Sequence, residues 1–323
     1  MAVRLSKTPT IMNKTLITIL LTVLMSATAQ AEFSRDFIDS HVIEKAKVGN
    51  ISIAYRVIGE GANRPKVVAI MGLGGEGAAW GDNMMRGLEA AGYEILLIDN
   101  RDTGDSSRFD AWGQPTLWWQ LLKYQLGFDV TAPYSINDMA ADIVAVMDER
   151  DYGGAHVIGV SMGGMIAQVV AAQYPERTAS LTSIMSSTFT PHLTPPTAAA
   201  ESGIRNLATG DAKEEREAAI RHRGFYPESM PRHLMAIFKA GDRSSEVMGI
   251  ATPTLVIHGS EDPLVPPPHG EHTAELIDGS RFILIEGMAH NIPEDKVPEI
   301  LGYLSEHIDT AENDSSGMAK LES

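Results

Sequence analysis

A serine flanked by glycines gives the first indication of chemistry in this chain of 323 residues. The run Gly159-Val160-Ser161-Met162-Gly163 matches the pattern Gly-x-Ser-x-Gly and lies between a strand-like apolar run and a segment with helical periodicity. In that setting the serine occupies a sharp, strained turn, because glycines two positions away remove Cβ atoms that would collide with the neighbouring strand and helix. The pattern predicts that Ser161 is a nucleophile, although a tight glycine-rich turn with an incidental serine would have the same sequence.

A serine hydroxyl is a weak nucleophile until a neighbouring base takes its proton, and that base is commonly a histidine held by a carboxylate. Residues of both kinds follow two later strand-like runs: Asp262 comes after "TPTLVIHG" and His290 comes after "RFILIEG". We therefore expect His290 to be the base and Asp262 to be the acid that orients it. Glu261 is an alternative acid, and His258, next to a glycine at a strand end, is expected to be structural.

The loop "MGLGGEG", residues 71–77, follows a strand-like run at the expected place for one half of an oxyanion hole. Its glycines let the backbone approach a substrate closely. The oxyanion formed when Ser161 attacks needs N–H donors, and Met162 N–H at the start of the next helix is one of them. We predict that Leu73 N–H in this loop is the other.

The same loop contains Gly-x-Gly-x-x-Gly, with Asp99 lying 22 residues after Gly77, and this combination is also typical of a dinucleotide site. A nicotinamide-dependent oxidoreductase is less favoured, because the motif follows the third strand-like run instead of opening a fresh strand–helix–strand unit. His269 and His272 could be imagined as metal ligands, but no carboxylate spacing supports such a site. We therefore expect neither a cofactor nor a metal.

The strand-like runs predict the fold. Eight of them occur, and the later ones alternate with helical patterns, which indicates an α/β protein with a mostly parallel eight-stranded sheet and helices on both faces. The first two runs are adjacent and alternate apolar with polar residues, so we expect an antiparallel hairpin at the sheet edge. The expected domain consists of a core (32–190 and 246–309), a helical cap insertion (191–245) and a disordered polar tail (310–323).

Residues 1–31 have the composition of a secretory signal peptide. They contain three basic residues and no acid, then an apolar run at 16–25 and an Ala-x-Ala site that ends at Ala31. The apolar run is shorter than the ~20 residues that a membrane-spanning helix needs. We therefore expect cleavage after Ala31, export to the periplasm or the exterior, and no stable membrane anchor afterwards. An uncleaved anchor is the alternative.

The composition excludes several classes of function. The formal net charge is −16, and it becomes −19 when the three basic residues of segment 1–31 are removed. Such a surface repels phosphate backbones, so no nucleic-acid partner is expected. The absence of cysteine excludes disulfides, thiol nucleophiles and cysteine-ligated metals. The expected partner is a small-molecule substrate, and the sequence does not indicate the oligomeric state.

Other side chains have an expected place as well. Three tryptophans in the segment 111–134 are expected to pack in the core, with the wall of an apolar substrate pocket as the alternative: Trp112, Trp118 and Trp119. Met162, Met165 and Met185 are expected in the core. Arg101 of "DNRDTGDSS" is expected to pair with a nearby carboxylate in a structural loop.

Taken together, the motifs resemble those of the α/β-hydrolase superfamily over residues 51–307. "MGLGG", "DNRDTGDSS", "HVIGVSMGGMIAQVVAAQYPE", "PTLVIHGSEDPLVP" and "GMAH" are similar to the branch that includes anthracycline methylesterases such as aclacinomycin methylesterase. Many relatives have His-Gly where this chain has Met71-Gly72, a difference that bears on the packing of this loop. The resemblance implies no cofactor and these site residues: Ser161, Asp262 and His290 for catalysis, and Leu73 and Met162 for the oxyanion hole.

The site residues and the resemblance together predict an exported serine hydrolase that cleaves carboxylic esters through an acyl-enzyme. The same residues would serve a lactonase, an amidase, a carbon–carbon bond hydrolase or a cofactor-free perhydrolase. A non-catalytic ligand-binding relative is a further alternative. Serine at position 161 argues against epoxide hydrolases and haloalkane dehalogenases, which usually have aspartate there.

Overall fold

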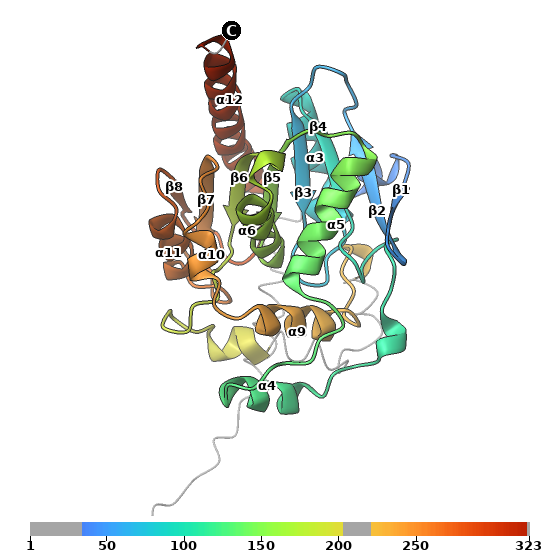
Figure 1. The fold of residues 1–323 in the computed structure, drawn as a ribbon, viewed down its shortest axis with the longest axis vertical. Coiled ribbons are helices and arrows are strands. Elements are labelled where there is room, and N and C mark those ends of the chain that lie inside the picture. The colour runs from blue at the N-terminus through green and yellow to red at the C-terminus, as the bar shows by residue number, and fades with distance from the viewer. Residues whose placement is uncertain (1–33, 203–220, 322–323) are drawn as a thin grey trace, which may run out of the picture.

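The structure is a computed structural model that describes residues 34–202 and 221–321. At its centre is an eight-stranded sheet with the order β1-β2-β4-β3-β5-β6-β7-β8 (Figure 1). β2 is antiparallel to both β1 and β4, and the remaining neighbours pair in parallel. The strands are β1 (Glu44–Val48), β2 (Ile51–Ile58), β3 (Lys66–Ile70), β4 (Glu94–Ile98), β5 (Ala155–Val160), β6 (Thr178–Ile184), β7 (Thr254–Gly259) and β8 (Arg281–Ile285).

The burial of the strands explains why the sequence predicted them well. β4 and β5 are buried at every residue, as strands are when helices cover both faces of a parallel sheet. β1 lies at the edge of the sheet and buries only Ala46 among its five residues. The predicted edge hairpin and the mostly parallel eight-stranded sheet are therefore confirmed.

Helices cover both faces of the sheet, as expected. α5 (Ile136–Glu149) and α6 (Met162–Gln173) pack together on one face, and α3 (Asp82–Ala90) and α12 (Val297–Leu321) pack together on the other (Figure 1). α5 begins at a capping box in which Ser135 Oγ accepts the N–H of Asp138 at 3.1 Å. Further helices with described bounds are α2 (Asp36–Asp39), α4 (Leu117–Gln125), α9 (Met230–Ala240), α10 (Ser244–Val247) and α11 (Pro268–Leu276), with 3₁₀ turns at Gly77–Trp80, Asp110–Trp112, Pro175–Arg177 and Glu294–Lys296.

Two excursions of the chain meet at one end of the molecule. α4 belongs to the segment after β4 and α9 to the segment after β6, and the two helices lie side by side in Figure 1. Aromatic rings join them, since the ring centroids of Tyr124 and Phe238 are 5.0 Å apart. α9 lies within the insertion expected at 191–245, of which residues 203–220 fall outside the described part of the chain.

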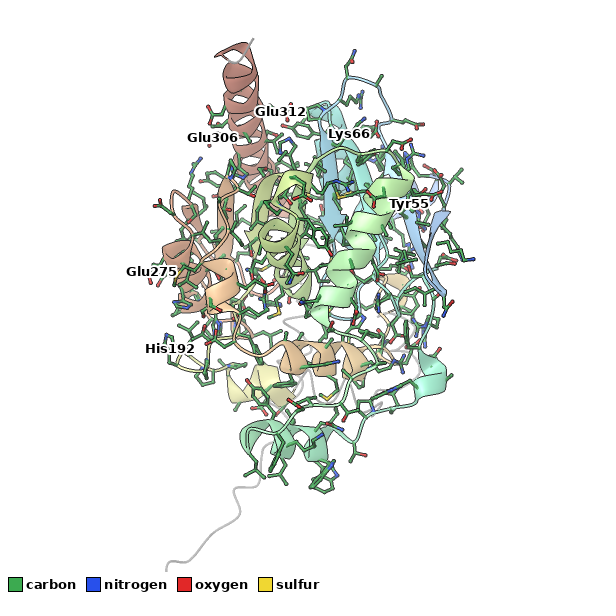
Figure 2. The ribbon with its side chains drawn as sticks, in the orientation of Figure 1. Tyr55, Lys66, His192, Glu275, Glu306 and Glu312 are labelled. Carbon is green, nitrogen blue, oxygen red and sulfur yellow. The ribbon has the colours of Figure 1, made fainter. Side chains whose placement is uncertain are left out.

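The expectation of a disordered tail at 310–323 is wrong for residues 310–321, because α12 continues to Leu321. The polar composition of the tail suggested disorder, but contacts just before and within it hold the helix against the sheet. Ile308 and Ala311 are buried, and Asp309 accepts a hydrogen bond from the Tyr93 hydroxyl at 3.2 Å. Glu312, labelled near the upper end of the view in Figure 2, lies 3.1 Å from His156 Nε2.

The expected signal peptide, residues 1–31, lies outside the described residues. Within the described ranges, every helix is too short or too polar to cross a bilayer. The signal peptide therefore stays a prediction.

The three tryptophans do not pack in the core, so that expectation is wrong. Trp112, Trp118 and Trp119 are exposed by 40%, 69% and 49%. Trp118 and Trp119 belong to α4, which packs against α9 at the end of the molecule and leaves its opposite side to solvent, and Trp112 lies in the 3₁₀ turn that precedes α4. The methionine expectation is confirmed, because Met162, Met165 and Met185 are all buried.

The glycines around Ser161 give a stability prediction. A Cβ atom on Gly163 would overlap the carbonyl oxygens of Ile70 and Met71, which belong to backbone and cannot move aside. We expect Gly163→Ala to lower the free energy of unfolding by at least about 3 kcal/mol, measured by urea denaturation. Gly302→Ala is the matched control, since a Cβ there would meet nothing within 4 Å and alanine favours the helix. Equal stability of the two variants would contradict the prediction.

Candidate active site

Ser161 stands at the turn between β5 and α6, as the sequence predicted. Its backbone has φ 56° and ψ −119°, a conformation that is strained for a residue with a side chain. Several bonds hold it there: Ser161 N–H donates to Ile184 O at 2.8 Å, and Ser186 Oγ–H donates to Ser161 O at 2.8 Å. The turn thus lifts the hydroxyl out of the sheet and is fixed by the neighbouring strand β6.

The structure brings Ser161, His290 and Asp262 together in one hydrogen-bonded series. Ser161 Oγ–H donates to His290 Nε2 at 3.0 Å, and His290 Nδ1–H donates to Asp262 Oδ2 at 2.6 Å. Asp262 and His290 lie in the loops that follow β7 and β8, so the carboxyl ends of three parallel strands supply the series. In this arrangement His290 can take the serine proton while the carboxylate orients its ring.

Asp262 is fixed by the backbone of its own loop. Its Oδ1 accepts N–H groups from Leu264 at 2.9 Å and Val265 at 2.8 Å, which leaves Oδ2 for His290. The alternative acid, Glu261, is exposed and does not contact the histidine. Asp262 is therefore the acid that the geometry supports.

His258 is buried beneath this loop. Its Nε2 donates to Val265 O at 2.7 Å and lies 3.6 Å from Asp262 Oδ2, and burial lowers its pKa. It supports the loop that carries the acid, in agreement with the structural role expected for it.

His269 and His272, which were considered as metal ligands, form hydrogen bonds with other residues of the protein. His269 contacts Ser187 Oγ through Nδ1 at 2.7 Å and donates to Thr194 O through Nε2 at 2.9 Å. Among residues 34–202 and 221–321, no three His, Asp or Glu side chains are grouped so that they could hold a metal ion.

The loop 72–77, which we call the oxyanion loop, lies against Ser161. A Cβ atom on Gly72 would come within 3.0 Å of Ser161 Cβ, so only glycine allows this approach without a shift. Leu73 N–H donates none of the hydrogen bonds found among the described residues, and Met162 is the first residue of α6, whose N–H has no partner inside the helix. Both predicted oxyanion donors are thus adjacent to the serine turn and free to bind a ligand oxygen.

Asp99, the residue that suggested a dinucleotide site, is buried and forms its hydrogen bonds within the protein. Its carboxylate accepts Gly77 N–H at 2.8 Å and Asp105 N–H at 3.0 Å, and burial raises its pKa to about 6. It fixes the end of the oxyanion loop and is not exposed to a ribose. The geometry therefore does not favour the dinucleotide alternative.

Sequence reasoning missed the side chains that hold the oxyanion loop from the other side. Gly74 N–H donates to His233 Nδ1 at 3.0 Å, and Tyr226 OH donates to Glu76 Oε2 at 2.7 Å. His233 and Tyr226 lie more than a hundred residues after the loop, and no local pattern distinguishes this histidine from the nine others. Only the tertiary fold could identify them.

The "DNRDTGDSS" loop is structural, and Arg101 pairs with a carboxylate as expected. Arg101 donates to Asp142 at 2.6 and 2.8 Å. The neighbouring Asp102 is fully buried and accepts two hydrogen bonds from the buried Arg232 of α9, at 2.5 and 2.8 Å. Burial alone would raise the pKa of Asp102, but the hydrogen bonds from Arg232 and Phe109 N–H bring it below its ordinary value. This second pair, which the sequence did not reveal, ties α9 to the loop that follows β4.

The buried histidine of α9 gives a pH prediction. Burial lowers the pKa of His233 to about 4, Arg232 and Arg108 acting in the same direction and Asp102 opposing them. The unfolded chain binds this proton near pH 6.5, so the histidine removes stability as the pH falls from about 6.5 to 4. Between pH 7.5 and 5 we expect wild type to lose about 2 kcal/mol more unfolding free energy than His233→Asn in urea denaturation. Parallel pH curves for the two proteins would contradict this assignment.

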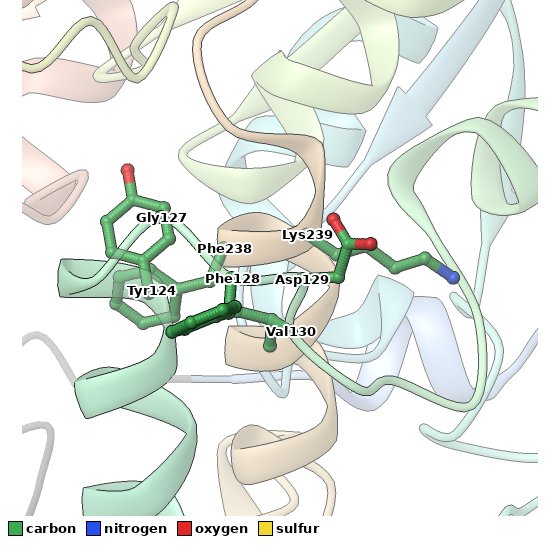
Figure 3. Close-up of a pocket in the computed structure, with 7 residues that line it drawn as sticks. All are labelled: Tyr124, Gly127, Phe128, Asp129, Val130, Phe238 and Lys239. Carbon is green, nitrogen blue, oxygen red and sulfur yellow. The ribbon is translucent and has the colours of Figure 1, made fainter.

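A cavity of about 470 Å³ lies between the α4 segment and α9 (Figure 3). Tyr124 and Phe128 line it from one side, and Phe238 and Lys239 from α9 line it from the other. Neither Ser161 nor the exposed tryptophans belong to its lining, so the tryptophans do not form the wall of this cavity.

Comparisons with known proteins support an α/β-hydrolase fold. The family model described as the alpha/beta hydrolase fold matches residues 65–224. A rhodomycin D methylesterase from Streptomyces peucetius is 28% identical over 281 residues, which cover 73% of this chain and 88% of that protein. An enol-lactonase from Burkholderia xenovorans superimposes with a TM-score of 0.62 at 21% identity, covering 82% of this chain and 100% of the other.

An esterase from a Rhodococcus species superimposes with a TM-score of 0.63, also at 21% identity, over 83% of this chain and 99% of the other. At this identity the two solved structures show the fold alone, whereas the methylesterase is a relative in sequence. The chain therefore has the α/β-hydrolase fold, with methylesterases among its relatives in sequence.

Proposed function

We propose that this protein is a serine esterase that hydrolyses carboxylic esters through an acyl-enzyme. The observation that carries the proposal is the hydrogen-bonded series from Ser161 Oγ through His290 to Asp262, with distances of 3.0 and 2.6 Å. Such a series makes a serine hydroxyl nucleophilic at neutral pH. The methylesterase relative supports esters as the substrate class.

In the first half of the reaction, His290 Nε2 takes the Ser161 proton as Oγ attacks the ester carbonyl carbon. The tetrahedral intermediate collapses with cleavage of the carbon–oxygen bond to the alcohol, and His290 gives its proton to the departing alkoxide. The products of this half are a free alcohol and an acyl group on Ser161. Asp262 stabilises the imidazolium that exists between the two proton transfers.

In the second half, His290 takes a proton from water, and the hydroxide attacks the acyl carbon. The tetrahedral intermediate collapses with release of the carboxylic acid as His290 gives its proton to Ser161 Oγ, so the enzyme is regenerated. In both halves the N–H groups of Leu73 and Met162 stabilise the negative oxygen. One such donor contributes roughly 10²–10³ in turnover in serine hydrolases, so the backbone supplies a large share of the rate.

The proposal is tested with purified protein, a fluorophosphonate probe and a panel of esters. We expect covalent labelling that an ester substrate slows, and hydrolysis of p-nitrophenyl esters and of methyl esters of aromatic acids, with alcohol and acid formed in equal amounts. Absence of both labelling and hydrolysis would overturn the proposal. With hydrogen peroxide or an amine added as acceptor, formation of a peracid or an amide in place of the acid would redirect the proposal to another reaction of the same residues.

We also propose that the protein acts outside the cytoplasm. The support is the signal-like composition of residues 1–31, which precede the folded domain. Fractionation of expressing cells should recover the esterase activity in the periplasm or the medium, with mature protein beginning at Glu32. Recovery of the uncleaved chain in the cytosol would overturn this part.

A further inference from the structure

We propose that His233 of α9 is a positioning residue that holds the oxyanion loop so that Leu73 N–H faces the carbonyl oxygen of a substrate on Ser161. The inference rests on the proposed function, because an oxyanion forms only if Ser161 attacks a carbonyl. It assigns to the cap helix a part in catalysis that goes beyond covering the site.

The central contact joins His233 to the peptide beside the predicted donor. Gly74 N–H donates to His233 Nδ1 at 3.0 Å, and His233 Nε2 donates to Arg101 O at 3.0 Å. The ring is thus neutral, with its proton on Nε2 and its acceptor aimed at the loop. Because Gly74 N belongs to the peptide that follows Leu73, this bond fixes the plane of the backbone next to the oxyanion donor.

Further contacts to the loop come from the same stretch of chain, residues 224–233, which we call the clamp segment. Tyr226 N–H donates to Gly74 O at 2.8 Å, so Gly74 forms both of its backbone hydrogen bonds with the clamp segment. Glu76 N–H donates to Gly224 O at 2.8 Å, and the Tyr226 hydroxyl donates to the Glu76 carboxylate at 2.7 Å. The clamp segment therefore holds the loop at two places, Gly74 and Glu76.

Few interactions within the oxyanion loop fix its backbone conformation. Four of its six residues are glycines, which have more backbone conformations available than any other residue. The one backbone hydrogen bond within the loop, among the bonds described, runs from Gly75 N–H to Gly72 O at 3.1 Å. Contacts from outside must fix its conformation, and His233 is the fully buried side chain that contacts it next to Leu73.

Burial keeps His233 in the state that the contact requires. Its pKa is lowered to about 4, so at neutral pH the ring carries no charge and Nδ1 remains an acceptor. A protonated ring would present N–H to Gly74 N–H and push the loop away. The stable acceptor is consistent with a role in geometry and not in proton transfer.

Asparagine and glutamine each reproduce the hydrogen bond of one imidazole nitrogen, so these two substitutions at position 233 give a matched test. Asparagine carries a carbonyl oxygen where histidine has Nδ1, so His233→Asn keeps an acceptor for Gly74 N–H and loses the bond to Arg101 O. Glutamine carries its amide one bond further, where histidine has Nε2, so His233→Gln keeps the bond to Arg101 O and loses the one to Gly74. Each variant loses one buried hydrogen bond, and we expect similar melting temperatures.

The measurements are kcat and KM for a p-nitrophenyl ester, and the Kd of phenylboronic acid, which forms a tetrahedral adduct on a nucleophilic serine. We expect kcat of His233→Gln to be at least about tenfold below that of His233→Asn, with KM values within about threefold of each other. The Kd of phenylboronic acid should be higher for His233→Gln than for His233→Asn by a similar factor, because an oxygen of the tetrahedral boronate adduct needs the same N–H donors.

Equal kcat and equal boronate affinity in the two variants would overturn the inference and show that the histidine only supports packing. If wild type neither hydrolyses esters nor binds the boronate, the proposed function fails and the inference with it, a different result from an active wild type with equivalent variants. If neither His233 variant folds, Tyr226→Phe takes their place, since it removes only the hydroxyl bond to Glu76. For Tyr226→Phe we expect kcat to fall by about threefold to tenfold at unchanged KM, which is the effect of weakening one oxyanion donor without removing it. An unchanged kcat would overturn the inference.

Discussion

Replacement of Ser161 by alanine is expected to lower kcat for ester hydrolysis by about 10⁴-fold or more, to a rate that fluorophosphonate no longer inhibits. The hydroxyl that accepts the acyl group is gone, and His290 loses the donor that lies 3.0 Å from its Nε2. Residual turnover would come from water held near the oxyanion donors. The measurement is the rate of p-nitrophenol release by matched amounts of wild type and variant.

The strained turn provides a control for folding in this experiment. Ser161 has φ 56°, which glycine adopts without cost, so Ser161→Gly should be as inactive as Ser161→Ala and more stable by up to about 1 kcal/mol. Loss of activity in a more stable protein separates chemistry from folding. Retention of hydrolysis in either variant would show that another residue is the nucleophile.

Replacement of Asp262 by asparagine is expected to lower kcat by about 10⁴-fold while the fold persists. Leu264 and Val265 N–H groups bind one oxygen of residue 262, and they will hold the amide oxygen of asparagine in that place. The amide NH₂ then faces His290 and donates to Nδ1, which leaves the imidazole proton on Nε2, pointing at the serine. A ring in that tautomer cannot accept the serine proton.

The adjacent acid gives the control for this second prediction. Glu261→Gln makes the same chemical change at an exposed carboxylate next along the chain, and we expect its kcat to equal that of wild type. Similar losses in both variants would indicate a general electrostatic effect of charge removal. A normal rate in Asp262→Asn would mean that His290 is oriented by another group.

Local sequence patterns sufficed for the sheet and for the nucleophile. β4 and β5 are largely apolar because both of their faces are buried, and Ser161 lies in a turn that places strict demands on the residues two positions away. Asp262 and His290 were found because parallel strands deliver their following loops to one edge of the sheet. These features depend on residues that are neighbours in the chain or on the alternation of strands and helices, and both can be recognised in a single sequence.

Features that depend on one helix meeting another were not predictable in this way. The exposure of Trp118 follows from the place of α4 at the end of the molecule, and its sequence is equally compatible with a buried helix. The helical tail depends on anchoring contacts such as that between Asp309 and Tyr93, 216 residues apart. His233 was missed for the same reason, since its partner Gly74 is 159 residues away.

The placement of the base after β8 has a consequence for biosynthesis. Ser161 and His290 are 129 residues apart, and translation completes the nucleophile turn, β6 and the cap before the strand that delivers the histidine exists. A nascent chain that has folded through β7 therefore has a serine turn without a base and cannot cleave the esters around it. Activity begins only when the carboxyl-terminal part of the chain has been made and has docked, so an amino-terminal fragment that ends before His290 should not turn over esters.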